Sequence, residues 1–108
     1  MRKRILELTR HKDGLNKNEL CIILAEEMKL EMVETRRILD ALLGLVTEAM
    51  AMDKKVLISD FGTFQIMHRE GFDGYNPHTD ERIPIPPRSI PSFKAGKLLK
   101  QRLNPKLD

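Results

Sequence analysis

Residues 61–87, FGTFQIMHREGFDGYNPHTDERIPIPP, contain two strand-like patterns separated by a polar, turn-rich segment. The first pattern alternates apolar residues and contains Gly62, which is typical of a bend, a bulge or a close backbone approach. In the second, Pro84 and Pro86 lie two positions apart, so their missing N–H groups face the same edge. We therefore predict a projecting two-stranded ribbon with a free edge.

Two amphipathic helices are predicted before this segment. Asn16 and Glu19 form a capping-box pattern at the start of the first helix, which is expected to extend to about residue 29. The second, about 32–52, has an apolar arc too wide for one short neighbour to cover. We expect a second subunit to cover the surplus face, with burial beneath the sheet as the alternative. The core-facing stripe predicted on the first helix consists of Leu20, Ile23, Leu24 and Met28.

A short helix is predicted at the end of the domain, from about Lys94 to Leu103, and Pro105 stops it. Its apolar leucines fall on one face, and its polar residues, spaced by three and four, fall on the other. The order of helices, strands with a long hairpin, and a last helix indicates an α+β fold. The predicted polar face consists of Lys94, Lys97, Lys100 and Gln101.

The composition indicates one small domain. The chain has 108 residues, of which 41% are hydrophobic, but it has no Trp and few aromatic residues to anchor a core, which favours dimerisation. The lone Cys21 lies in an apolar run and is interpreted as a buried small hydrophobe. No apolar stretch approaches the roughly 20 residues needed to cross a bilayer, so we expect a soluble, cytoplasmic protein without a membrane partner.

The net charge of +3 is unevenly distributed. Residues 1–13 contain five basic and two acidic side chains, and residues 82–107 contain seven basic side chains and no acidic one. Such segments are typical of surfaces that face phosphates, although simple solvation of the charges is the alternative. We interpret residues 1–15 as a basic extension that ends at a turn-like Asp13-Gly14 pair, with a flexible arm as one interpretation.

Catalytic and metal-binding patterns are weak. No Gly-rich phosphate loop, nucleophile elbow or paired-carboxylate motif is present, so we do not expect an enzyme or a cofactor. Asp73, His78 and Asp80 are close in sequence, but they lie on a turn-rich tip with no evident supporting residues, and no metal is predicted.

A series of short motifs resembles the HU / integration host factor family of bacterial histone-like proteins. The resemblance covers about residues 16–103. The motifs, in order, are Asn16-Lys17 with Glu19-Leu20, Phe61-Gly-Thr-Phe64, Gly74-x-Asn-Pro-x-Thr79, Ile83-Pro-Ile85, and Pro91-Ser-Phe-Lys-Ala-Gly-Lys-x-Leu-Lys100.

The resemblance implies an intertwined homodimer, or a heterodimer with a paralogous subunit, that binds and bends double-stranded DNA in the nucleoid with little sequence specificity. Two helices would form the base, with a three-stranded antiparallel sheet, a β-ribbon arm at about 66–86 and a short C-terminal helix within a domain at 16–104, followed by a tail at 105–108. Pro77 would wedge between base pairs at the arm tip. The implied dimer or core residues are Leu42, Leu45, Val46, Phe61, Phe64 and Phe93. The implied DNA contacts are Arg69, Tyr75, Asn76, Arg82, Arg88, Ser92, Lys94, Lys97 and Lys100, joined by Arg2, Lys3 and Arg4 of the extension.

The arm departs from the family pattern in its charge. Residues 68–82 contain two basic and four acidic side chains, and Tyr75 replaces the arginine that usually precedes the Asn-Pro pair. An acidic arm should repel phosphate, which makes the body and the basic extension the main expected contacts. The alternative function is a family-shaped dimer with reduced DNA binding that acts as a protein-interaction or scaffold module.

Overall fold

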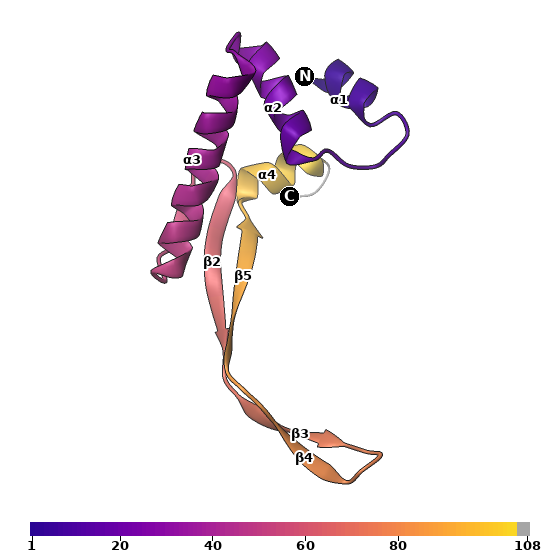
Figure 1. Ribbon diagram of the computed structural model, residues 1–108, viewed down its shortest axis with the longest axis vertical. Helices are drawn as coiled ribbons and strands as arrows, with labels where there is room; N and C mark the ends of the chain where they lie inside the picture. The colour runs from indigo at the N-terminus through magenta and orange to yellow at the C-terminus, as the bar shows by residue number, and fades with distance from the viewer. Residues whose placement is uncertain (106–108) are drawn as a thin grey trace. The chain divides into compact units, whose positions relative to one another are not determined.

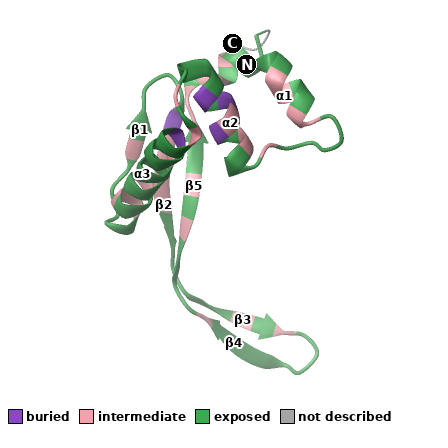
Figure 2. Ribbon diagram, turned by 45° about the horizontal axis from the view of Figure 1, so that its top comes forward, coloured by how far each residue is buried: buried purple, intermediate pink, exposed green. Residues whose placement is uncertain are grey.

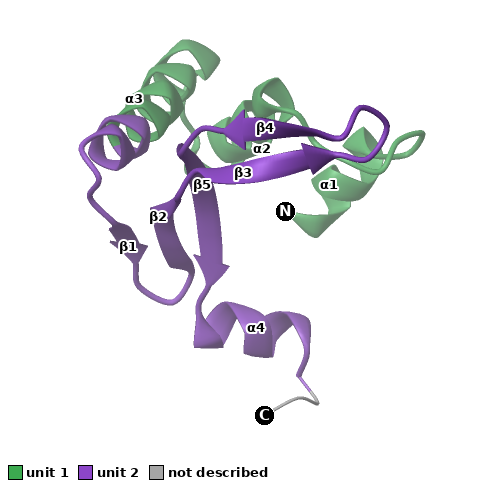
Figure 3. Ribbon diagram, turned by 90° about the horizontal axis from the view of Figure 1, so that it is seen from below, with its two compact units in different colours: residues 1–45 green, residues 46–108 purple. Residues whose placement is uncertain are grey.

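The computed structural model describes residues 1–105 and divides them into two compact units, unit 1 (residues 1–45) and unit 2 (residues 46–105), shown in Figure 3. The predicted tail lies outside the described residues, except for Pro105. No helix in the described part is long and apolar enough to cross a membrane. The element order, shown in Figure 1, is α1 (Arg2–Leu8), α2 (Lys17–Met28), α3 (Met32–Ala51), β1 (Val56–Ile58), β2 (Gly62–Arg69), β3 (Phe72–Asn76), β4 (Glu81–Ile85), β5 (Arg88–Ala95) and α4 (Lys97–Leu103).

The capping box predicted at the start of α2 is present. The Glu19 N–H donates to Asn16 Oδ1 at 2.8 Å, and the Asn16 N–H donates to Glu19 Oε1 at 3.1 Å. At the other end, Lys29 adopts a left-handed conformation with φ 56°, and the Leu30 N–H donates to the Ala25 carbonyl at 3.0 Å. These bonds satisfy backbone groups that the helix leaves free, and they turn the chain into α3.

The basic extension contains a helix that was not predicted. Arg2–Leu8 form the helix α1, whose Ile5 and Leu8 are half-buried and which packs on α2. The high density of charge masks the short apolar side of this helix in the sequence, so no helix was predicted here. Asp13 and Gly14 lie in the connection to α2.

The buried core is small, as Figure 2 shows for α2 and α3. Cys21 and Thr35 are fully enclosed, and Ile23 and Ala25 are nearly so. The Thr35 hydroxyl donates to the Glu31 carbonyl at 2.9 Å, which satisfies its polar atom. Cys21 is a buried small residue, as predicted, but the predicted core-facing stripe is only partly correct. Of that stripe, Ile23 is buried in the single chain, whereas the side chains left exposed are Leu20, Leu24 and Met28.

Unit 2 contains the predicted three-stranded antiparallel sheet, in the order β1-β2-β5. The ladder between β2 and β5 is long, from the pair Gly62–Ala95 to the pair Arg69–Arg88. On one face of this sheet, the ring of Phe93 lies 4.8 Å from that of Phe64 and 5.4 Å from that of Phe61, measured between centroids. Tilted aromatic contacts of this kind add to the stabilisation from buried area.

Gly62 permits the close approach predicted for it. A Cβ at this position would lie 2.6 Å from both the Lys94 carbonyl oxygen and the ring of Phe93. The backbone of β5 cannot move away from this Cβ without breaking the β2–β5 ladder. Gly62→Ala should therefore destabilise the fold by about 1–3 kcal/mol, the usual cost of overpacking. Thermal unfolding followed by circular dichroism measures this loss.

Gly14→Ala is the matched control, because a Cβ at Gly14 meets no atom within 4 Å. Its melting temperature should equal that of the parent protein. An unchanged melting temperature for Gly62→Ala would contradict the close approach.

The predicted ribbon is present as the antiparallel pair β3–β4, which runs from the pair Phe72–Ile85 to the pair Asn76–Glu81. Figure 1 shows it continuing beyond β2 and β5, and Figure 2 shows that most of it is exposed. At the tip, the Asp80 N–H donates to the Asn76 carbonyl at 2.9 Å, and Asp80 has a left-handed φ of 62°. The polar segment is therefore an ordered hairpin without a core of its own.

The predicted start of the last helix is wrong. Lys94 belongs to β5, where it pairs with Thr63, and α4 begins only at Lys97. The ladder continues through Ala95, and the hydrogen bond from the Gly96 N–H to the Phe61 carbonyl, at 2.8 Å, keeps the chain extended up to that point. Gly96 then takes the N-cap position in an extended conformation.

Candidate nucleic-acid interface

The β2–β5 ladder places the aromatic pair and most of the basic side chains on opposite faces, although the apolar pair Met67–Ile90 shares the basic face. Residues that pair directly point to the same face, and the face alternates along each strand. Phe64 and Phe93 pair and therefore define the aromatic face. The adjacent pairs define the opposite face, which we call the polar face, and they are Thr63–Lys94, Gln65–Ser92, Met67–Ile90 and Arg69–Arg88.

Four predicted DNA contacts thus share one face of the sheet. They were predicted one by one from the sequence, and the register of β2 with β5 brings them together. The polar face combines cationic side chains with hydrogen-bonding ones, which is the composition that contacts phosphate oxygens in protein–DNA complexes. These four residues are Arg69, Arg88, Ser92 and Lys94.

The polar face continues into a concave surface at the start of α4. An open concavity of about 590 Å³ lies there, and the basic side chains that line it are Lys94 from β5 and Lys97 and Lys100 from α4. All three lysines are exposed, and no ion pair among residues 1–105 involves them. The other lining residues are Thr63, Ala95, Gly96, Gln101 and Asn104.

Arg69 and Arg88 occupy directly opposed positions at the end of the ladder nearest the ribbon. Like charges directly opposite each other across a ladder destabilise strand pairing. Both side chains are exposed, and no ion pair in the described part of the chain involves either arginine. An anion between them would relieve the repulsion.

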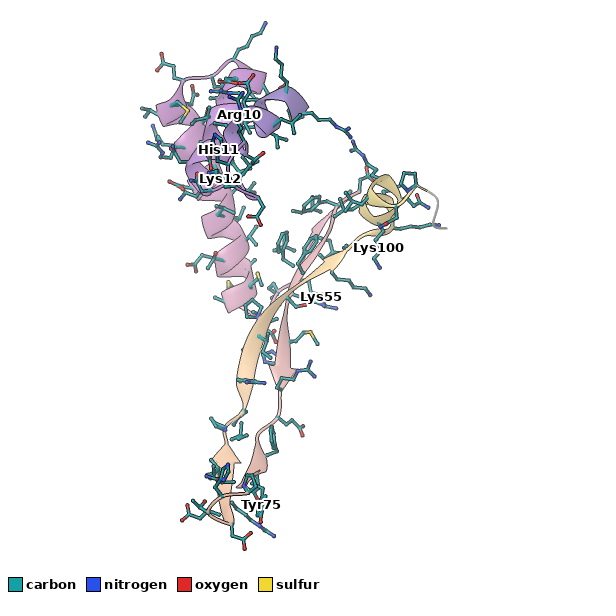
Figure 4. All side chains as sticks on the ribbon, turned by 90° about the vertical axis from the view of Figure 1, so that its right-hand side faces the viewer. Arg10, His11, Lys12, Lys55, Tyr75 and Lys100 are labelled. Atoms are coloured by element: carbon teal, nitrogen blue, oxygen red, sulfur yellow. The ribbon has the colours of Figure 1, made fainter. Side chains whose placement is uncertain are left out.

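Hydrogen bonds order the ribbon tip around Pro77. The Tyr75 hydroxyl donates to the carboxylate of Asp80 across the hairpin. The His78 N–H donates to Asn76 Oδ1 at 2.9 Å, so a side-chain-to-backbone turn spans Pro77. Pro77 itself is exposed. Figure 4 places Tyr75 at the end of the ribbon and Lys100 on α4 at the other end of unit 2. Arg82 pairs with Tyr75 across the ribbon.

The predicted dimer or core residues are incompletely covered in the single chain. Leu42 is 51% exposed and Leu45 is 68% exposed on α3, and Val46 is half-buried. In the aromatic cluster, Phe64 is half-buried, whereas Phe61 and Phe93 are exposed despite their contacts. This much exposed apolar area on a chain with so small a core needs a partner surface.

Several residues of the site were not predicted from the sequence. Thr63 and Gln65 lie on the polar face and Asn104 lines the concavity. The alternation of β2 could have identified the first two once its register with β5 was known. The exposed His68 hydrogen-bonds to Asp53 at 2.9 Å and to Ser89 at 3.2 Å.

The candidate metal ligands at the ribbon tip do not form a site. Among residues 1–105, no three His, Cys, Asp or Glu side chains are grouped so that they could hold a metal ion. Asp80 instead accepts the hydrogen bond from Tyr75.

A lysine-lined concavity beside a sheet that carries a long exposed ribbon defines a β-ribbon protein with a basic surface. The family model described as "Bacterial DNA-binding protein" matches residues 15–104. "DNA-binding protein HU" from Clostridium pasteurianum is 41% identical over 90 residues, covering 83% of this chain and 99% of that protein. "DNA-binding protein HU-alpha" from Vibrio cholerae is 38% identical over 89 residues, with coverage of 82% and 99%.

Solved structures agree with this match. The Anabaena HU–DNA cocrystal structure superposes with a TM-score of 0.75 at 34% identity, covering 84% of this chain and 99% of that one. HU from Thermotoga maritima gives a TM-score of 0.61 at 29% identity, with coverage of 83% and 100%. The chain belongs to the bacterial DNA-binding protein family that includes HU.

Proposed function

We propose that this protein is an architectural DNA-binding protein that acts as a dimer and bends duplex DNA with low sequence specificity. The observation that carries this proposal is the convergence of Lys94, Lys97 and Lys100 on one concavity that continues the polar face. Phosphate contacts position a protein on the duplex without reading its sequence. The family match and the HU relatives support this function over the alternative, a dimer with reduced or altered DNA binding that acts as a protein-interaction or scaffold module.

The proposed phosphate contacts of the body are the basic and polar side chains of β2, β5 and α4. They are Arg69, Arg88, Ser92, Lys94, Lys97 and Lys100. The proposed partner is double-stranded DNA, which places the protein in the cytoplasm on the nucleoid. The function needs no cofactor and no catalytic step.

The second subunit is proposed to be another copy of this chain or a paralogue, seated on the exposed apolar side chains of α3 and of the aromatic cluster. Leu42 and Phe93 illustrate the need for it, since they are 51% and 41% exposed. Covering large apolar side chains of this kind contributes roughly 1.5–3 kcal/mol for each one fully buried.

Titration of linear, nicked and pre-bent duplexes at several salt concentrations tests the function. We expect binding to all three at low salt, a preference for the pre-bent and nicked duplexes, and an affinity that falls steeply as salt rises. Absence of binding to every duplex at low salt would refute the proposed function.

Pro77 is the proposed wedge at the ribbon tip, with Tyr75, Asn76 and Arg82 beside it in the groove. Pro77→Ala should reduce DNA bending more than affinity, because an inserted apolar ring unstacks a base step at a cost of a few kcal/mol and the bend recovers that cost through wider contact. Bending is measured by fluorescence energy transfer between the ends of a labelled duplex.

His78→Ala is the matched control, because its side chain makes no hydrogen bond among the described residues whereas its N–H, retained in the variant, closes the turn at Asn76. It should bend DNA like the parent protein. Equal bending by Pro77→Ala would refute the proposed wedge role of Pro77.

A further inference from the structure

The basic N-terminal segment lies outside the family match, which begins at residue 15. Within unit 1 it forms α1 and the connection to α2. Figure 4 labels two of its basic residues, Arg10 and Lys12. The five basic side chains of the segment are Arg2, Lys3, Arg4, Arg10 and Lys12.

Two of these cations are held by carboxylates. Arg4 Nε lies 3.2 Å from Glu26 Oε1 of α2, and Arg4 Nη1 lies 3.0 Å from Glu7 Oε2 of its own helix. Lys12 forms an ion pair with Glu19 of the capping box. The hydrogen bond from Lys12 and that from the Asn16 N–H lower the pKa of Glu19 below its usual value. Arg4 and Lys12 therefore tie both ends of the segment to α2.

The other three cations are exposed, and no ion pair among residues 1–105 involves them. Arg2 and Lys3 lie in the first turn of α1, and Arg10 lies just after the helix ends. Positive charge in a first turn opposes the helix dipole, so Arg2 and Lys3 do not stabilise α1. The half-buried side of the helix, with Ile5 and Leu8, contacts α2 and leaves these cations in solvent.

We propose that α1 is a second, ordered phosphate-binding element, held on α2 by Arg4 and Lys12, that contacts duplex DNA through Arg2, Lys3 and Arg10. This proposal rests on the proposed DNA-binding function and adds a surface in unit 1 to the one in unit 2. The charge of the three exposed cations complements phosphate. Residues 1–15 contain no Phe, Tyr or Trp, the large aromatic side chains on which single-stranded bases stack, which favours a duplex.

The test is the salt dependence of DNA binding by the full chain carrying Arg2→Gln, Lys3→Gln and Arg10→Gln together. Each lost phosphate contact reduces the slope of log affinity against log salt by about 0.9, so we expect a reduction of about 2.7 for each protomer that engages DNA. Between 50 and 200 mM salt the parent protein should lose about 40-fold more affinity than this variant. An unchanged slope would overturn the proposal.

Arg4→Gln is the matched control, because it removes one positive charge from the same helix. We expect the slope to stay that of the parent protein, because the Lys12–Glu19 and Met1–Glu27 ion pairs still hold the segment on α2. The amide hydrogens of residues 5–9 should exchange faster with solvent, because the ion pair between Arg4 and Glu26 is lost. Loss of one phosphate contact reduces the slope by about 0.9. A reduction of that size in Arg4→Gln would show that Arg4 contacts DNA, and it would overturn its assignment as a residue that only holds α1 on α2.

Two further measurements separate this proposal from its competitors. Both the parent protein and the triple variant should bind DNA at low salt through unit 2; if neither binds, the proposed function itself fails. Flotation with phosphatidylglycerol vesicles tests the exposed Leu6 beside the cations as a membrane contact. Vesicle binding lost in the triple variant, with an unchanged DNA slope, would assign α1 to a lipid surface instead.

Discussion

Lys94→Ala, Lys97→Ala and Lys100→Ala combined should nearly abolish DNA binding at physiological salt. The three lysines line one concavity, and the loss of their phosphate contacts should reduce the salt slope by at least about 2.7, or twice that if both protomers of a dimer engage DNA. The affinity at 200 mM salt should therefore fall by orders of magnitude relative to the parent protein. Fluorescence anisotropy with a labelled duplex at stepped salt concentrations measures both quantities.

The fold should survive these substitutions, because all three side chains are exposed. The thermal unfolding curve should accordingly match that of the parent protein. A matched pair of single variants tests whether the loss of DNA affinity depends on where the lysine lies. Lys97→Ala should weaken DNA binding, whereas Lys29→Ala, on the exposed connection between α2 and α3, should not. Equal losses in the two would point to net charge alone.

Leu42→Glu should dissociate the dimer. Leu42 lies in the middle of α3, is 51% exposed in the single chain and is proposed to lie in the subunit interface. Symmetry repeats the substitution in both subunits, and losing about 2 kcal/mol of apolar burial in each raises the dissociation constant about 1000-fold, before the cost of an unpaired carboxylate is counted. Sedimentation equilibrium at micromolar concentration should show monomer, and DNA affinity should fall with it.

Leu6→Glu provides the comparison for this variant. Leu6 is 71% exposed on α1, so the same chemical change occurs outside the proposed interface. This variant should remain dimeric and keep its melting temperature. A dimeric Leu42→Glu protein with unchanged stability would contradict the assignment of α3 to the interface.

Local sequence patterns predicted most of the fold because they act over short distances. The Asn16–Glu19 capping box, the need for glycine at position 62 and the ribbon with Pro84 all depend on neighbouring residues or on one pairing partner. The start of α4 was predicted too early because the β5 ladder, which depends on a distant strand, holds Lys94 in an extended conformation.

The site was predicted as a set of residues but not as a surface. Lys94, Lys97 and Lys100 were assigned to one helix face, whereas they converge from a strand and a helix. The polar face required the register of β2 with β5, which no local pattern contains, so Thr63 and Gln65 were overlooked. Helix α1 was overlooked for a similar reason, since its order depends on Glu26, 22 positions after Arg4.

The two arginines that oppose each other at the junction of sheet and ribbon make strand pairing there depend on electrostatic repulsion. In the empty protein the charges of Arg69 and Arg88 push the last pair of the ladder apart, and added salt screens that force. A phosphate between them would turn the same two charges into a clamp. A phosphate held there would therefore make the ribbon of a DNA-bound protein stiffer than the ribbon of the free protein.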